Sequence, residues 1–276
     1  MKLSPRYGTD PLLRLDGDPA SIAEPLVGQR RRLLETVAKF GPDDWAHQSR
    51  CEDWSSRDVI HHLVSTNGFW ELSLTAGMAG TPTTILADFD PAATPSLLIA
   101  GAPERSDQHL LDAFAASVES LATLVEAMSE ADWTMLGESP PGHVSLSAVA
   151  HHALWDSWIH ERDILLPLGQ TVPTVAPEVE ACIRYVAGLN PAFGVGSGRS
   201  AGGSFAVATT EPVVAAVIEA HDHVTVRAGA DAGVTQVTGS TVELIDALSR
   251  RAPFTADIAA DEQWMFDGLG TVFDQI

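Results

Sequence analysis

The sequence is poor in cysteine and has no leader-like or membrane-spanning apolar run. Its 276 residues include two cysteines, Cys51 and Cys182, which lie far apart and form no CxxC pair. Two such cysteines cannot form a disulfide framework, and this scarcity is typical of proteins of the reducing cytoplasm. The first residues lack the apolar core of a signal peptide, and no apolar run is long enough to span a bilayer. We therefore expect a cytoplasmic protein.

The sequence is also short of positive charge. Its formal net charge is −21 at pH 7, from 16 basic and 37 acidic side chains, and only two of the basic residues are lysines. Arginines cluster only at residues 30–32 and 250–251, whereas phosphate backbones bind through larger basic clusters. The negative charge also repels anionic lipid surfaces. We expect neither a nucleic-acid nor a membrane partner, and the sequence leaves the oligomeric state open.

Apolar residues, in contrast, are abundant. They make up 45% of the chain and charged residues 19%, as in globular proteins with a substantial core. The length suggests two domains of ordinary size. A chain this long needs neither disulfides nor a structural metal to stay folded. A metal site in it would therefore serve function.

The first 170 residues have the pattern of a helical bundle. Apolar residues recur at helical spacing in four long segments, and no strand signal is evident between them. Ser55 and Asp58 form a capping box that predicts where the second helix begins. The predicted helices cover residues 20–40, 55–77, 106–130 and 145–166, with a long crossover at 80–104. We predict an α-helical four-helix bundle in residues 1–170.

The pattern changes after Gly169. We expect a helix at residues 177–189 and a flexible glycine-rich connector at 194–203. Four short strand-like runs follow, at residues 204–209, 213–218, 223–227 and 235–238. Ser240 and Glu243 form another capping box, which predicts a helix to about residue 250, and a last helix is expected near 262–273. Residues 171–276 therefore predict a small α+β domain.

A stripe of ionisable side chains runs along the predicted helix at 145–166. Four of them share one face with apolar neighbours: His152, Asp156, His160 and Asp163. Burying such groups is costly unless their charge is compensated, and a divalent cation would compensate it. Asp156 and His160 have the i, i+4 spacing that can chelate one ion, and His62 can face them from the second helix. The same pattern also fits an exposed Asp–His pair and a core histidine, so it leaves both interpretations open.

Two segments contain motifs of a known family. Residues 50–63, RCEDWSSRDVIHHL, are similar to a C-x-x-W-(S/T)-x-R-D-V-x-x-H-L signature, and residues 156–163, DSWIHERD, to an E-x-x-x-H-x-x-D signature. Both resemble the mycothiol-dependent maleylpyruvate isomerase family, a branch of the DinB-like metal-binding bundles. Residues 237–253 are similar to its sterol-carrier-protein-like C-terminal domain. The resemblance covers nearly the whole chain and implies that His62, Asp156 and His160 are metal ligands.

The sequence departs from the family pattern at one ligand position. Asp156 stands where the family usually has Glu, and its carboxylate is one methylene shorter. His152, one turn earlier on the same face, could substitute for it or act as a fourth ligand. We retain Asp156 as the predicted ligand.

The resemblance also implies a chemistry. It implies a divalent metal, for which we predict zinc, and mycothiol as co-substrate. A cation lowers the pKa of a coordinating thiol, and the thiolate can then add to a double bond, for cis–trans isomerisation, or attack another electrophilic carbon, for thiol transfer. Arg251 stands at the position of the family's L-x-x-R arginine, which implies that it binds the carboxylate of a small anionic substrate. A surface arginine at a helix C-terminus is the alternative interpretation.

Several alternatives stay open beside this predicted isomerase or transferase. The chain could be a non-catalytic small-ligand-binding protein whose metal site is weakened by Asp156, or a metal-dependent hydrolase. Cys51 precedes a helix without an identifiable base nearby, which indicates a packing residue. Asp163 could either orient a ligating imidazole or be solvated.

Overall fold

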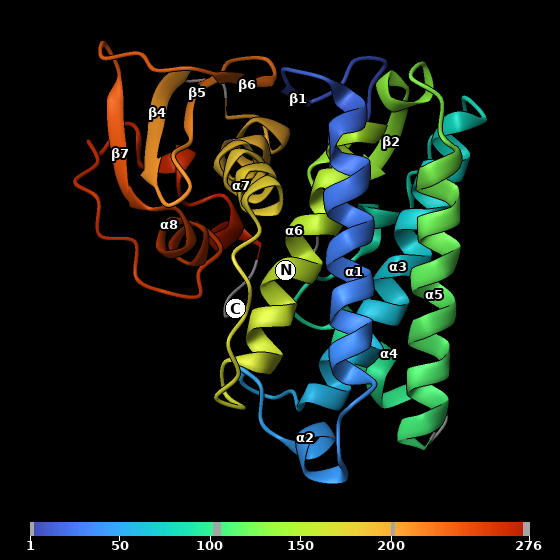
Figure 1. Cartoon of the computed structure of the whole chain (residues 1–276). Coiled ribbons are helices and arrows are strands. Elements are labelled where there is room, and N and C mark those ends of the chain that lie inside the picture. The colour runs from blue at the N-terminus through green and yellow to red at the C-terminus, as the bar shows by residue number, and fades with distance from the viewer. Residues whose placement is uncertain (1–2, 102–105, 200–201, 273–276) are drawn as a thin grey trace.

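The computed structural model describes residues 3–101, 106–199 and 202–272. Four long helices stand beside a five-stranded sheet, and another helix, α7, lies between them (Figure 1). The four helices of the bundle are α1 (Ala23–Val37), α3 (Ser56–Met78), α5 (Asp107–Ala127) and α6 (Leu146–Leu165). A helical N-terminal domain followed by an α+β region is thus confirmed as the fold class.

Three of the four bundle helices, α3, α5 and α6, begin where a serine side chain caps a free backbone N–H group. Ser55 Oγ accepts a hydrogen bond from the Asp58 amide at 3.3 Å, and Asp58 Oδ2 accepts one from the Ser55 amide at 2.9 Å. Ser106 Oγ and Ser145 Oγ each accept a hydrogen bond from the backbone amide three residues later, at the start of α5 and α6. Since α6 contacts α1, α3 and α7, most of its residues are buried, including His152, His160 and Asp163, whereas Asp156 and Arg162 are partly buried.

The N-terminal half contains more than the predicted helices. A hairpin of β2 (Leu136–Ser139) and β3 (Gly142–Ser145) precedes α6, so the prediction that no strand interrupts the helices is wrong here. Nearly every residue of these two strands is buried, so they lack the alternation of apolar and polar residues that marks a half-buried strand. The predicted crossover also holds elements of its own, η2 (Ile85–Asp88) and α4 (Thr94–Gly101), and its residues 102–104 lie outside the described part of the chain. A further short helix, α2 (Pro42–Ala46), follows α1, and 3-10 turns η1 (Pro19–Ile22) and η3 (Asp132–Thr134) precede α1 and β2.

The sheet has the strand order β1-β6-β5-β4-β7. Its strands are β1 (Leu13–Leu15), β4 (Gly203–Thr210), β5 (Ala215–Ala220), β6 (Val224–Ala228) and β7 (Thr235–Ser240). Neighbouring strands are antiparallel except at its two edges, where β1 runs parallel to β6 and β7 parallel to β4. All four predicted strands are present. The fifth strand, β1, was not predicted and comes from the N-terminal segment. The division of the chain at residues 170 and 171 stays a prediction, because this strand joins the sheet of the second half.

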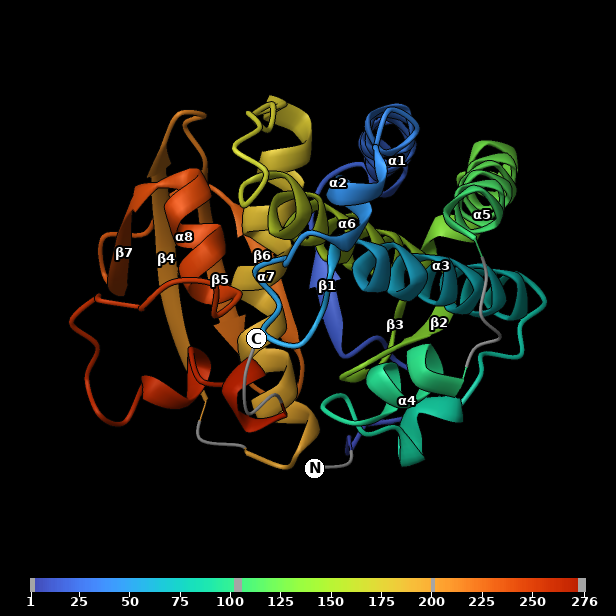
Figure 2. The ribbon, with the colours of Figure 1, turned by 90° about the horizontal axis from the view of Figure 1, so that it is seen from below.

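Helix α7 (Ala176–Gly196) packs between the sheet and α6 (Figure 2). It continues through Pro191 and into the predicted connector, because burial along its length outweighs the backbone bond that proline removes. A Cβ at Gly188 would lie 2.6 Å from Val226 Cγ2 and 2.9 Å from Leu13 Cδ1, so glycine allows the helix to approach β1 and β6 closely.

The C-terminal segment contains one predicted helix and lacks another. Helix α8 (Thr241–Leu248) is present as expected. The last predicted helix is instead two 3-10 turns, η4 (Gln263–Met265) and η5 (Leu269–Thr271), and its residue 273 lies outside the described part. Residues 200–201 of the predicted connector also lie outside it. Within the described ranges, no helix combines the length and apolarity needed to cross a membrane.

Candidate metal centre

Helices α3 and α6 bring three possible metal ligands together. Asp156 Oδ1 lies 3.8 Å from His62 Nε2 and 3.7 Å from His160 Nε2. The three ligating atoms all lie within 4.8 Å of one another. These distances are too long for hydrogen bonds, whereas two ligands of one tetrahedral zinc ion lie about 3.4 Å apart. The arrangement therefore fits a shared cation better than direct pairing.

The polar atoms of this group are incompletely satisfied by protein. Asp156 Oδ2 is buried and has no hydrogen-bond partner among the residues that the structure describes. The side chains of His62 and Asp156 are each only 14% exposed. A buried acceptor without a partner costs free energy, and more so when it is charged. A cation bound by Asp156 would remove that cost.

A buried arginine lies behind the group. Arg30 of α1 donates from Nε to Asn67 Oδ1 at 2.9 Å and from Nη2 to the Ala153 carbonyl at 2.9 Å. Burial lowers the pKa of Arg30 to about 10, although the charge of Asp156 opposes this. Sequence reasoning missed this residue, because the Arg30–Arg32 cluster was considered only as a weak phosphate-binding patch.

His160 is held from its other side by Asp163. His160 Nδ1 lies 3.0 Å from Asp163 Oδ2, and since a carboxylate can only accept, Nδ1 donates this bond. Asp163 is fully buried and also accepts bonds from Arg50 Nε at 2.9 Å and Arg251 Nη2 at 2.7 Å. Solvation of Asp163 is therefore wrong, and its role in orienting a ligating imidazole stays a prediction that this hydrogen bond supports. The bond directs His160 Nε2 towards Asp156.

The pKa values of these groups reflect burial and mutual charge. Burial alone would lower the pKa of His160, but its hydrogen bond to Asp163, assisted by Cys51 and Asp156, raises it to about 10. Burial lowers the pKa of His62 more than Asp156 raises it. Burial would raise the pKa of Asp156, but the two histidines hold it well below its usual range. Without a metal the group therefore holds a proton on His160 at neutral pH.

Cys51 has an imidazole beside it. Its Sγ lies 3.9 Å from His160 Nδ1 and 3.4 Å from Asp163 Oδ2. The prediction that no base lies near Cys51 is therefore wrong, because the partners come from α6, more than a hundred residues later in the chain. Cys51, His160 and Asp163 form a second group with ligand-like spacing, which shares His160 with the first.

Arg251 is buried in an ion pair. Its side chain is 5% exposed, and both Nε and Nη2 donate to Asp163. The alternative of a solvated arginine at a helix end is therefore wrong. Its Nη1 is buried and has no hydrogen-bond partner in the described part of the chain. A role in binding substrate stays a prediction, and only this third nitrogen is available for it.

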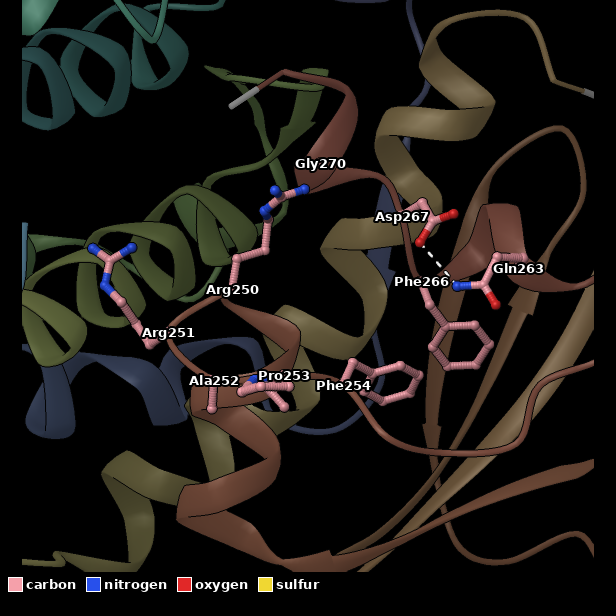
Figure 3. Close-up of a pocket in the computed structure, with 10 residues that line it drawn as sticks. Arg250, Arg251, Ala252, Pro253, Phe254, Gln263, Phe266, Asp267 and Gly270 are labelled. Atoms are coloured by element: carbon pink, nitrogen blue, oxygen red, sulfur yellow. Dashed lines mark hydrogen bonds between the residues drawn. The ribbon is translucent and has the colours of Figure 1, made fainter. Parts of the chain in front are cut away.

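Arg251 also lines a surface pocket of about 490 Å³ that is next to α8 (Figure 3). Its side chain points away from the two phenylalanines of the pocket, Phe254 and Phe266, whereas Arg250 points towards Gly270. The pocket therefore lies on the opposite side of the Arg251 backbone from the ion pair with Asp163.

His152 belongs to neither group of ligands. Its Nδ1 lies 2.6 Å from the Tyr185 hydroxyl and 3.2 Å from Ser139 Oγ. Among the described residues, the groups with ligand spacing do not include it. The arrangement gives no support to His152 as a substitute for Asp156.

The sequence of the bundle matches a known family. Residues 26–165, which contain all three candidate ligands, match the family described as mycothiol maleylpyruvate isomerase N-terminal domain. The chain belongs to this family. None of the curated proteins matches the chain.

The similarity to solved structures extends beyond the matched domain. The crystal structure of the mycothiol-dependent maleylpyruvate isomerase aligns with a TM-score of 0.57 and 16% identity, over 85% of this chain and 88% of that one. A histidine-to-alanine mutant of that isomerase aligns with the same TM-score at 15% identity and with the same coverage. At such low identity the likeness establishes the fold, and it extends from the family's bundle into the α+β region.

Proposed function

We propose that this member of the mycothiol maleylpyruvate isomerase N-terminal domain family is a metal- and thiol-dependent enzyme. It would use a divalent cation, with zinc as the first candidate, and mycothiol to isomerise a small electrophilic anion or to transfer the thiol to it. The observation that supports this most is the three-ligand group of His62, Asp156 and His160, in which Asp156 Oδ2 has no hydrogen-bond partner among the described residues. Three protein ligands leave one position for an exogenous ligand, as in catalytic zinc sites.

The cation would supply one chemical property, a thiol pKa low enough for a thiolate nucleophile at neutral pH. The chain's own residues would supply the rest. Asp163 fixes the ring of His160 so that Nε2 faces the ion position. The Trp54 ring packs beside both imidazoles, with its centroid 5.1 Å from that of His62 and 6.3 Å from that of His160.

The position of Arg251 favours a substrate with a negative charge. Its Nε and Nη2 are used by Asp163, and Nη1 has no partner in the described residues. Arg251 and His160 both hydrogen-bond Asp163 Oδ2, so the guanidinium lies near the ligand group. We infer that Nη1 binds one oxygen of a substrate carboxylate, rather than the two that a free guanidinium could bind.

The direct test uses protein loaded with Co²⁺, which gives a visible spectrum where zinc gives none. Adding mycothiol should produce a thiolate-to-cobalt absorption band, and adding cysteine should not. Mycothiol should then support turnover of maleylpyruvate or of a generic electrophile such as 1-chloro-2,4-dinitrobenzene. Hydrolysis of an ester or amide panel without thiol would indicate a metal hydrolase instead. Protein that binds neither metal nor mycothiol would indicate a non-catalytic binding protein.

A further inference from the structure

A buried polar cluster lies one helical turn from Asp156, and the proposed function does not use it. It joins three elements through His152 of α6, Tyr185 of α7 and Ser139 of β2. Tyr185 and Ser139 have no exposed surface, and His152 is 6% exposed. Polar groups in an apolar interior are costly unless they are hydrogen-bonded, so the direction of each bond in the cluster matters.

The hydroxyl protons fix the direction of the chain of hydrogen bonds. Ser139 hydrogen-bonds Tyr185, and the Tyr185 hydroxyl lies 2.6 Å from His152 Nδ1. If Nδ1 donated to Tyr185, the tyrosine proton would have to go to Ser139, and the described residues offer no further acceptor for the serine proton. The chain therefore runs from Ser139 to Tyr185 to His152 Nδ1, which accepts.

A neutral imidazole with an accepting Nδ1 has its proton on Nε2. His152 is neutral at pH 7, because burial lowers its pKa to about 4. In the described part of the chain, every hydrogen bond of His152 involves Nδ1, so the Nε2–H stays available to a ligand. The rings of Trp70 and Trp155, with centroids at 4.8 and 5.2 Å, hold the imidazole plane in place.

The position of His152 relates this donor to the metal centre. His152 and Asp156 are four residues apart on the same face of α6, and the charge of Asp156 acts on His152. We propose that His152 is the hydrogen-bond donor to the carbonyl oxygen of the substrate, and that Tyr185 and Ser139 position it in the Nε2–H form. This proposal rests on the proposed function and narrows its substrate to a carbonyl compound with a conjugated double bond.

The reaction needs such a donor when charge moves onto oxygen. As the thiolate sulfur bonds to the β-carbon, the electrons of the C=C bond shift and the carbonyl oxygen becomes an enolate oxygen, towards which Nε2–H donates. Rotation about the resulting single bond, cleavage of the C–S bond and return of the electrons give the isomerised alkene and the thiolate. No proton is transferred. A preorganised donor of this kind contributes roughly 10²- to 10³-fold to a rate.

The first test reads the tautomer and does not depend on activity. Nitrogen-15 histidine spectra of wild-type protein should show His152 as the neutral Nε2–H form at pH 7. Tyr185→Phe should shift it to a mixture with the Nδ1–H form, whereas Tyr7→Phe, which removes the hydroxyl of the only other tyrosine, should not. A wild-type His152 in the Nδ1–H form would overturn the proposal, whatever the enzyme does.

The second test separates this role from metal binding. With mycothiol and maleylpyruvate as probes, His152→Gln should lower kcat about 10²-fold and Tyr185→Phe about tenfold, with metal content and the KM for mycothiol unchanged. Tyr7→Phe should keep wild-type kcat. Loss of metal in His152→Gln would make His152 a ligand and overturn the proposal, as would an unchanged kcat in both variants. Inactive wild-type protein with the Nε2–H tautomer would instead contradict the proposed function and, with it, the donor role.

Discussion

The two sides of His160 face two groups of ligating side chains, and they differ in how well the protein satisfies them. On the Nδ1 side, Asp163 accepts bonds from His160, Arg50 and Arg251 at 2.7–3.0 Å. On the Nε2 side, Asp156 Oδ1 lies 3.7–3.8 Å from both imidazoles, and its other oxygen has no partner in the described residues. On the first side the Asp163 carboxylate is fully paired by protein, and on the second the side chains have the spacing of ligands around an ion.

This difference indicates which group can take a cation. A metal on the Nδ1 side would have to displace two arginines from Asp163, and their charges would repel it. A metal on the Nε2 side would displace only the proton of His160 and would satisfy the buried oxygen of Asp156. The ion pairs of Asp163 therefore hold His160 in place for the ligand group around Asp156, as the outer partners of metal-bound histidines commonly do.

The largest expected effect comes from breaking the ion pairs of Asp163. Asp163→Asn leaves Arg50 and Arg251 with an uncharged partner, and we expect a loss of about 3–5 kcal/mol in the free energy of unfolding. Metal affinity should fall roughly 10- to 100-fold, because His160 loses its orienting acceptor. Denaturant unfolding of metal-free protein and a metal-competition titration measure the two effects.

The matched control for this variant is Asp246→Asn. Asp246 also accepts hydrogen bonds from Arg50 and Arg162, but these are longer, at 3.3–3.5 Å, and its side chain is 14% exposed. Its loss should cost at most about 1 kcal/mol and leave metal affinity unchanged. An equal loss of stability in both variants would mean that the buried ion pairs of Asp163 contribute no more to the free energy of unfolding than the partly exposed ones of Asp246.

A smaller effect concerns the pH dependence of metal binding. The raised pKa of His160, about 10, means that metal-free protein holds a proton there at neutral pH. A metal must displace this proton, so raising the pH removes a competitor. Metal affinity should therefore rise about tenfold per pH unit from pH 7 to 9. A competition titration at several pH values checks this, and an affinity that is flat over the range would show that His160 Nε2 is not a ligand.

The smallest effect is expected from Cys51→Ser. Cys51 Sγ lies only on the Nδ1 side, at 3.4 Å from Asp163 Oδ2, and serine retains a group that can donate there. Metal content measured by elemental analysis should equal that of wild type. Loss of the metal would mean that the ion binds on the Nδ1 side of His160, which would contradict the assignment of the cation to the Nε2 side.

The local parts of this account could be predicted from the sequence. The capping box of Ser55 and Asp58 located the start of α3, and i, i+4 spacing placed Asp156 and His160 on one face of α6. These features depend on neighbours within one helical turn. Helical spacing alone could not show that His62 faces this pair, because that depends on how α3 packs against α6. The family resemblance predicted it.

The rest depends on contacts between distant residues. Cys51 meets His160, and Arg251 meets Asp163, across separations of 109 and 88 residues, which no local pattern records. The His152–Tyr185 bond likewise joins α6 to α7. Strand β1 has three residues, and α7 continues through a proline, so pairing and burial decide both elements against their local signals.

The central claim is that one cation lies between His62, Asp156 and His160, and the metal content of two neighbouring variants tests it most directly. After equilibrium dialysis against Zn²⁺, wild-type protein and His61→Ala should each retain a single equivalent, because His61 belongs to neither ligand group among the described residues. His62→Ala should retain none. Retention of the ion by His62→Ala, or its absence from wild-type protein, would contradict the account.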